Sequence, residues 1–190
     1  SFKLKIGKEF ALYPPYLRLQ KRPYIRPYSL PILQEKVVVF CNEKTMEVPR
    51  DRWPEDFFNL TINNMSGFTV GGKKFFTAVR AGKINIVERN SHEAIITSLG
   101  KGETNCYIND RLSILYTLER MKKDGRYPNH YLKLVEAAKV SVENGFLGFT
   151  NNDKGQFPFK IDFVTKFNKE LVKMIKSGER DKIIQEFLER

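Results

Sequence analysis

The sequence predicts an α/β fold, and three observations support this prediction. Short strand-like runs alternate with segments whose apolar residues recur every three or four positions, as they do in amphipathic helices. Most of these helical segments end at a glycine, which is typical of helix C-termini. The clearest strand, EKVVVFC at Glu35–Cys41, is β-branched at its centre, as buried strands often are. The alternation favours mostly parallel sheets.

The predicted strands are short apolar runs that stand between turn residues. The segment 45–66 is expected to be irregular, because it contains two prolines and then the turn residues Asn63 and Asn64. In chain order, the predicted strands are Lys3–Gly7, Glu35–Cys41, Phe68–Val70, Ile84–Glu88, Thr104–Ile108, Lys133–Val135 and Phe146–Thr150.

The predicted helices each combine an apolar stripe with a start or stop signal. Lys73–Ala81 is the first, and Ser91 and Asn109-Asp110 are the expected N-caps of the next two. Gly178 separates the last two helices. The stripes of these two consist of Val164, Phe167, Leu171 and Ile175 in the first, and of Ile183, Ile184, Phe187 and Leu188 in the second.

Size and charge place the chain among ordinary globular proteins. Its 190 residues, 41% hydrophobic and 29% charged, suffice for one large domain or two small lobes. The net charge of +11 comes from 33 basic and 22 acidic residues without any block of five or six like charges. This spread favours a basic solvated surface over a nucleic-acid face. No apolar run approaches the length of a membrane-spanning helix, and no signal-peptide pattern opens the chain, as expected of a mature or trimmed chain or of a cytoplasmic protein.

The usual residues of catalytic and metal sites are few. Cys41 and Cys106 lie in apolar runs, so two buried free thiols are the default, with a disulfide open if the protein is secreted. His92 and His130 are far apart and lack cysteines at metal-ligand spacing, so both are expected at the surface or in caps. No P-loop, G-x-G-x-x-G or G-x-S-x-G motif is present. The sequence therefore predicts no catalytic residue, no metal site and no cofactor.

Several stretches carry short motifs of arginine, aromatic, proline and glycine residues in a distinctive order. They are YPPY (Tyr13–Tyr16), KRPYIRPYSLPI (Lys21–Ile32), GFTVGG (Gly67–Gly72) with NCYIND (Asn105–Asp110), and FLGF (Phe146–Phe149) followed by the two C-terminal helices. Together they resemble the polar-amino-acid family (family 3) of bacterial periplasmic solute-binding proteins, the receptors of ABC transporters.

The resemblance implies the type II periplasmic-binding-protein fold, in which two lobes close on a ligand about hinge strands. Residues 1–41 would form part of lobe one and the first hinge strand, and residues 42–140 would form lobe two. Residues 141–190 would supply the second hinge strand and the helices that return to lobe one. The family has a much longer segment between the YPPY turn and the arginine motif, whereas Tyr16 and Arg22 are only six residues apart here. Lobe one is therefore expected to be incomplete.

The resemblance also implies a ligand site. Arg22 would hold a ligand carboxylate with its planar guanidinium, although a solvated arginine is the plain alternative. Asp110 would bind a ligand ammonium group, with a simple helix N-cap as the alternative. Gly71 and Gly72 could bring backbone N–H groups to the carboxylate, or simply form a tight turn. The remaining expected ligand-binding residues are Tyr13, Tyr16, Tyr28, Ser29 and Thr69.

The implied function is that of a receptor rather than an enzyme. It would sit in the periplasm, or be lipid-anchored outside the cytoplasm, after loss of a signal peptide. As a monomer it would capture a small polar ligand for a membrane ABC permease, without a cofactor and without nucleic acid. Two alternatives stay open, namely a ligand-sensing or dehydratase-like module on the same fold, and a basic single-strand nucleic-acid-binding domain. The latter would use Arg18, Lys21, Arg22 and Arg26 interleaved with Tyr16, Tyr24 and Tyr28.

Overall fold

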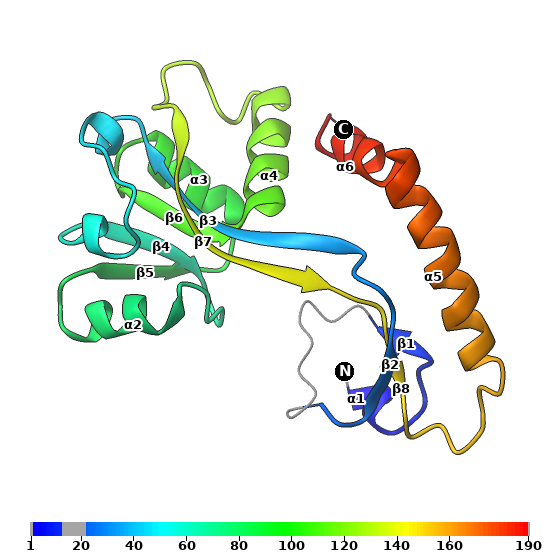
Figure 1. The fold of residues 1–190 in the computed structure, drawn as a ribbon. Coiled ribbons are helices and arrows are strands. Elements are labelled where there is room, and N and C mark those ends of the chain that lie inside the picture. Colours follow the sequence, from blue (N-terminus) through cyan, green and yellow to red (C-terminus); the bar gives the residue numbers. More distant parts are fainter. Residues whose placement is uncertain (1, 13–21, 190) are drawn as a thin grey trace. The chain divides into compact units, whose positions relative to one another are not determined.

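The computed structural model describes residues 2–12 and 22–189 and divides the chain into two compact units (Figure 1). Unit 1 comprises Ser1–Glu35 and Glu143–Glu186, and unit 2 comprises Lys36–Val142 and Phe187–Arg190. The boundaries fall within two long strands, β3 (Leu33–Asn42) and β7 (Leu134–Gly145), which therefore contribute residues to both units.

Unit 2 is built on a five-stranded sheet with the order β5-β4-β6-β3-β7. Besides β3 and β7, its strands are β4 (Thr61–Met65), β5 (Asn85–Arg89) and β6 (Cys106–Asp110). Strand β4 runs parallel to both β5 and β6, whereas β3 runs antiparallel to β6. The sheet is therefore mixed. The expectation of mostly parallel sheets holds only for strands β5, β4 and β6.

Helices cover both faces of this sheet (Figure 1). One face packs on Phe75 and Ala78 of α2 (Gly72–Arg80), and the other packs on α3 (His92–Gly100) and α4 (Arg111–Lys123). Two short 3₁₀ turns, η1 (Thr45–Glu47) and η2 (Glu55–Phe57), complete the unit. Alternating side chains of β3 supply both cores, because successive residues of a strand point to opposite faces.

Unit 1 is the smaller of the two. Its sheet is antiparallel with the order β1-β8-β2, formed by β1 (Ala11–Leu12), β2 (Ile25–Tyr28) and β8 (Gly148–Thr150). Phe10 joins this sheet to the helical part through edge-on ring contacts at 5.1 Å to Phe149 and 5.3 Å to Phe163. The helices are α1 (Phe2–Lys5), α5 (Lys160–Ser177) and α6 (Glu179–Glu189), whose residues up to Glu186 belong to this unit.

A disulfide joins Cys41 to Cys106, so the expectation of two free thiols is wrong. The two residues are directly opposite each other in the antiparallel pairing of β3 with β6, a non-local contact that the sequence does not reveal. The bond closes a loop of 65 residues, and such a loop is worth roughly 4 kcal/mol in the chain-entropy model. Disulfides persist in oxidising compartments, which is consistent with an extracytoplasmic location.

Two segments differ from the sequence prediction near the N-terminus and in the centre. The expected strand at 3–7 is replaced by helix α1, since Phe2–Lys5 contains no β-branched residue. The expected strand at 68–70 is absent, and the segment 45–66 instead contains β4. Strand β4 was not predicted because it contains two asparagines, a residue type that is uncommon in strands. In the structure both are buried, and Asn63 donates from Nδ2 to Thr104 Oγ1 at 2.7 Å and to the Cys106 carbonyl at 3.1 Å. Polar residues satisfied in this way carry no strand signal in the sequence.

Strands β1 and β2 and the two 3₁₀ turns were not predicted, whereas the remaining elements lie where the sequence places them. Ser91 caps α3 by accepting the Ala94 N–H, and Gly178, with a φ of 78°, ends α5 in the left-handed conformation. Strand β7 is much longer than the expected piece at 133–135. None of the helices among residues 2–12 and 22–189 is both long and apolar enough to cross a bilayer.

Candidate functional site

Three parallel strands of unit 2 end at one edge of the sheet. Met65 of β4 is in register with Arg89 of β5, and Asn63 of β4 is in register with Tyr107 of β6. The carboxyl ends of β4, β5 and β6 therefore lie together. In open α/β sheets, ligands bind outside the carboxyl ends of the strands.

Asp110 stands at this edge as the last residue of β6 and the N-cap of α4. Its Oδ1 accepts hydrogen bonds from the backbone N–H of Ser113 at 3.0 Å and from the Ser113 hydroxyl at 3.1 Å. Its Oδ2 is buried and has no hydrogen-bond partner within the described structure. One oxygen of the carboxylate thus acts as the cap, and the other is left for a donor.

Asn64 presents a second acceptor of the same kind. The residue is fully buried, and its Nδ2 donates to the Phe68 carbonyl at 2.8 Å, while its Oδ1 finds no partner among the described residues. Asn64 and Asp110 each come two residues after members of one core cluster, Ile62 and Ile108, so their side chains leave the same face of the sheet. Asn64 was not predicted as a site residue, because an Asn-Asn pair in the sequence is typical of a turn.

The opposite face of this edge carries a hydrogen-bonded polar network. The Tyr107 hydroxyl lies 2.7 Å from Nδ1 of His92 and accepts from Nδ2 of Asn109. Burial raises the pKa of Tyr107 above its usual range and lowers the pKa of His92, so the imidazole stays neutral. His92 is thus half-buried and bonded to the core rather than a plain surface residue, whereas His130 is exposed as expected.

The loop between β4 and α2 contains Thr69 and Gly71, and Gly72 is the first residue of α2. Gly71 is the N-cap of α2 with a φ of 115°, and its carbonyl accepts a hydrogen bond from the Trp53 indole at 2.9 Å. A Cβ added to Gly71 would lie 2.5 Å from a ring carbon of Phe75, so packing requires glycine here. No side chain caps α2, which leaves the first N–H groups of that helix open to other acceptors. Thr69 and Gly72 are exposed.

The predicted residues of unit 1 lie around β2. Arg22 is half-buried, and its carbonyl accepts the Ile25 N–H at 3.0 Å. The Tyr28 hydroxyl is buried without a partner in the described part of the chain, and burial raises its pKa. Ser29 has a structural role, since its hydroxyl donates to the Leu30 carbonyl at 2.7 Å and accepts the Leu147 N–H at 2.9 Å. Tyr13 and Tyr16 lie outside the described residues.

The predicted site residues thus fall into two groups, one in each unit. The group in unit 2 shares one sheet edge, where Asp110 and the β4–α2 loop follow strands that are parallel neighbours. The group in unit 1 is formed by residues in and beside β2. Within residues 2–12 and 22–189, no set of three or more histidine, cysteine, aspartate and glutamate side chains could hold a metal ion.

No protein-family model and no curated protein sequence matches the chain. Solved structures match its whole length. Substrate-binding domain 2 of Lactococcus lactis GlnP, in the open conformation, is 16% identical with a TM-score of 0.68 over 100% of this chain and 73% of that one. The GluR0 ligand-binding core, in complex with L-glutamate, is 18% identical with a TM-score of 0.62 over 100% and 75%. The Streptococcus pneumoniae amino-acid ABC transporter protein AbpA, bound to L-arginine, is 14% identical with a TM-score of 0.63 over 99% and 71%.

The chain therefore has the type II periplasmic-binding-protein fold, as the sequence motifs predicted. Within that fold, its structural likeness extends to the family-3 amino-acid-binding proteins of ABC transporters. These three structures are a substrate-binding domain, a ligand-binding core and an amino-acid-binding protein. Their extra length, about a quarter of each chain, is consistent with one incomplete lobe.

Proposed function

We propose that the chain is an extracytoplasmic solute-binding protein that captures a small polar ligand with an ammonium group, such as an amino acid. The observation that carries this proposal is the unpartnered Oδ2 of Asp110. A buried carboxylate oxygen without a donor is costly, and a cationic N–H group of a ligand would satisfy it. The fold shared with amino-acid-binding proteins supports the same chemistry.

The ligand carboxylate needs donors of its own. The uncapped N-terminus of α2 offers backbone N–H groups beside Gly71, and helix N-termini favour anions. Arg22 would add a guanidinium from unit 1, with Tyr13, Tyr16 and Tyr28 as aromatic walls. A ligand that contacts both units would stabilise a closed state by flexing β3 and β7, and a membrane ABC permease would recognise that state.

A ligand-sensing module is the second candidate. It is favoured by one observation, the likeness of the whole chain to the GluR0 ligand-binding core. A solute-binding protein and a ligand-sensing module both bind a small polar ligand, and they differ only in the partner that recognises the closed state. The nucleic-acid alternative depends in part on Arg18 and Lys21, which lie outside the described residues.

The proposal is tested by titrating the twenty amino acids against the chain in a thermal-shift assay, followed by calorimetry on those that stabilise it. Asp110→Asn is the informative variant, because asparagine caps a helix as well as aspartate does but carries no charge. We expect unchanged folding and a loss of roughly one to two decades of affinity. Asp124→Asn, at an exposed aspartate after α4, serves as the control. Stabilisation by none of the amino acids, or equal affinity in Asp110→Asn, would contradict the proposal.

A further inference from the structure

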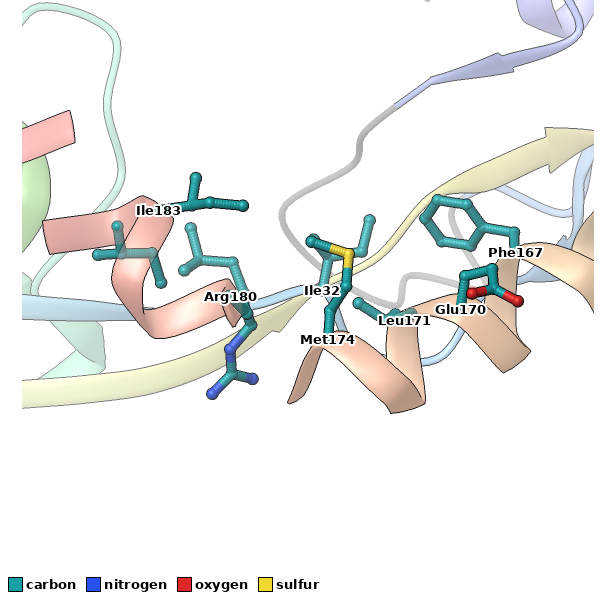
Figure 2. A pocket seen from close by; sticks show the side chains of 9 residues that line it. Ile32, Phe167, Glu170, Leu171, Met174, Arg180 and Ile183 are labelled. Carbon is teal, nitrogen blue, oxygen red and sulfur yellow. The ribbon is translucent and has the colours of Figure 1, made fainter. Parts of the chain in front are cut away.

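A pocket in unit 1 and the sheet edge of unit 2 differ in their chemistry. The pocket lies between α5, α6 and the start of β3, and its volume is about 530 Å³ (Figure 2). Seven of its nine lining side chains are apolar, and the two charged ones, Glu170 and Arg180, form ion pairs with neighbours on their own helices. The pocket therefore offers little to a small polar ligand. The unsatisfied polar groups of unit 2 are the better guide to recognition.

Two adjacent asparagines of β4 allow a direct comparison, because Asn63 and Asn64 are both fully buried. The amide of Asn63 is satisfied at both ends. Its Nδ2 donates to Thr104 Oγ1 at 2.7 Å and to the Cys106 carbonyl at 3.1 Å, and its Oδ1 accepts from Arg89 at 3.4 Å. In contrast, Oδ1 of Asn64 has no hydrogen-bond partner among residues 2–12 and 22–189. A buried acceptor without a donor destabilises the folded chain, so packing alone accounts for Asn63 but not for Asn64.

The unsatisfied atom of Asn64 is its oxygen rather than its nitrogen. Nδ2 donates to the Phe68 carbonyl at 2.8 Å, and a carbonyl oxygen can only accept. Turning the amide over would place two acceptors against each other and leave the N–H groups unpaired. The Phe68 carbonyl therefore fixes which amide atom is which, and what Asn64 lacks is a donor.

Asp110 has the same deficiency on the neighbouring strand. Strands β4 and β6 are parallel neighbours in which Asn63 lies opposite Tyr107, so Asn64 and Asp110 are diagonal neighbours on one face of the sheet. The strand spacing and the rise per residue put their Cα atoms about 8 Å apart, and a small group between the two side chains reaches both. Both free atoms are oxygens. An ammonium group has three N–H donors and no acceptor, so it suits two oxygens better than a hydroxyl or an amide does.

We propose that Oδ1 of Asn64 is a second acceptor for the ammonium group of the ligand, beside Oδ2 of Asp110, and that this pair selects primary over N-methylated amines. The inference rests on the proposed function and deepens it. Two acceptors require two N–H bonds, and each methyl group on the nitrogen replaces one of these bonds with a carbon that cannot donate. The charge of Asp110 alone does not discriminate in this way, because a methylated ammonium group keeps its positive charge.

The first test compares the same substitution at the two asparagines by thermal melting of the chain without ligand. Asn63→Leu removes a donor from Thr104 and Cys106, and we expect the melting temperature to fall by roughly 5 °C or more. Asn64→Leu removes an unsatisfied acceptor, and water can replace its amide at the Phe68 carbonyl, so this variant should melt close to the parent. Alanine at each position repeats the comparison in case leucine overpacks the site. A loss at Asn64 as large as that at Asn63 would make the Asn64 amide structural and overturn the inference.

The second test measures selectivity by calorimetry. The probes are the amino acid that stabilises the chain most among the twenty and the N-methyl derivative of that amino acid. The parent should bind the primary amine at least roughly ten-fold more tightly than the derivative. In Asn64→Leu, the affinity for the primary amine should fall by roughly ten-fold or more, and the preference should shrink to roughly three-fold or less. An unchanged affinity or an unchanged preference in this variant would overturn the inference, as would proline, a secondary amine, as the tightest ligand.

The outcomes for Asn64 and Asp110 separate this inference from the proposed function. If Asp110→Asn weakens binding and Asn64→Leu does not, the ligand site stands and only the role of Asn64 is wrong. If none of the twenty amino acids stabilises the chain, the proposed function fails, and the inference fails with it. Weaker binding in both variants, together with a reduced preference in Asn64→Leu alone, supports both.

Discussion

The hydroxyl of Tyr107 lies 2.7 Å from Nδ1 of His92, and this hydrogen bond joins strand β6 to the first residue of helix α3. Because the Tyr107 oxygen already accepts from Asn109, its proton is directed to His92. A protonated imidazole could not accept that hydrogen bond. The polar network therefore depends on a neutral His92, in agreement with the lowered pKa that burial causes.

The state of His92 predicts how stability depends on pH. The pKa of His92 in the folded chain is below that of the unfolded chain, about 6.5, so the unfolded state binds more protons as the pH falls. This contribution to stability is complete above pH 6.5 and is lost as the pH falls through the lowered pKa. We expect the melting temperature of His92→Asn to fall less than that of the parent between about pH 8 and about pH 5. For a chain of this size, each kcal/mol of unfolding free energy shifts the melting temperature by about 2–4 °C.

His130 supplies the matched control for that measurement. Its side chain is exposed, so His130→Asn should follow the parent at every pH. A parallel pH dependence in the parent and both variants would show that His92 is not the titrating group.

The Cys41–Cys106 disulfide should raise the free energy of unfolding, and reductant should remove this contribution only slowly while the chain is folded. Both cysteines are fully buried, so the folded chain should resist reduction until it unfolds. The double variant Cys41→Ala, Cys106→Ala should lose roughly 2–4 kcal/mol of unfolding free energy in urea. Added dithiothreitol should lower the urea midpoint of the parent and leave that of the double variant unchanged. An equal midpoint for both proteins under oxidising conditions would contradict the bond.

Gly71 and Gly72 form a matched pair for separating backbone strain from packing. Both have positive φ, 115° and 81°, but only a Cβ at Gly71 meets a neighbour, Phe75, whose ring is held by Trp53. Gly72→Ala should cost roughly 1–2 kcal/mol for the left-handed conformation. Gly71→Ala should cost roughly 1–3 kcal/mol more, because the clash is added. Urea unfolding of both variants measures the difference, and equal losses would show that Phe75 moves aside freely.

Arg22 and Arg26 form a matched pair for the proposed ligand site. Arg22 is half-buried and stands at the arginine position that the resemblance implies for the ligand carboxylate, whereas Arg26 is exposed and does not match that position. Arg22→Ala should weaken binding of the amino acid found by thermal shift by roughly one to two decades, since a charge-assisted contact is lost. Arg26→Ala should bind as the parent does. Equal affinities measured by calorimetry would remove Arg22 from the site.

The local signals of the sequence were the dependable ones. Caps and glycine stops are short-range features, so Ser91, Asp110 and Gly178 marked the ends of their helices correctly. Strand β4 was missed because it contains two buried asparagines, one of which, Asn63, is satisfied by partners about forty residues away, at Thr104 and Cys106. Pairing partners of this kind are set by the tertiary fold and leave no local pattern.

The same distinction applies to the candidate site. Asp110 was found because a carboxylate at a strand end before a helix is a local motif. From the sequence, Asp110 could be either the N-cap of a helix or a ligand-binding residue. In the structure, Oδ1 of Asp110 caps α4, and Oδ2 has no hydrogen-bond partner among the described residues. Asn64 was missed because its importance comes from burial beside β6, which only the sheet creates.

The two hydrogen bonds from Ser113 also fix the torsion angles of the Asp110 side chain before any ligand arrives. A side chain that is already immobilised loses little rotamer entropy on association, so more of its interaction energy remains as affinity. The same tether links the carboxylate to the first turn of α4. Any ligand that rotated the carboxylate away from Ser113 would uncap this helix, so the preorganised acceptor also selects for the direction from which a donor approaches.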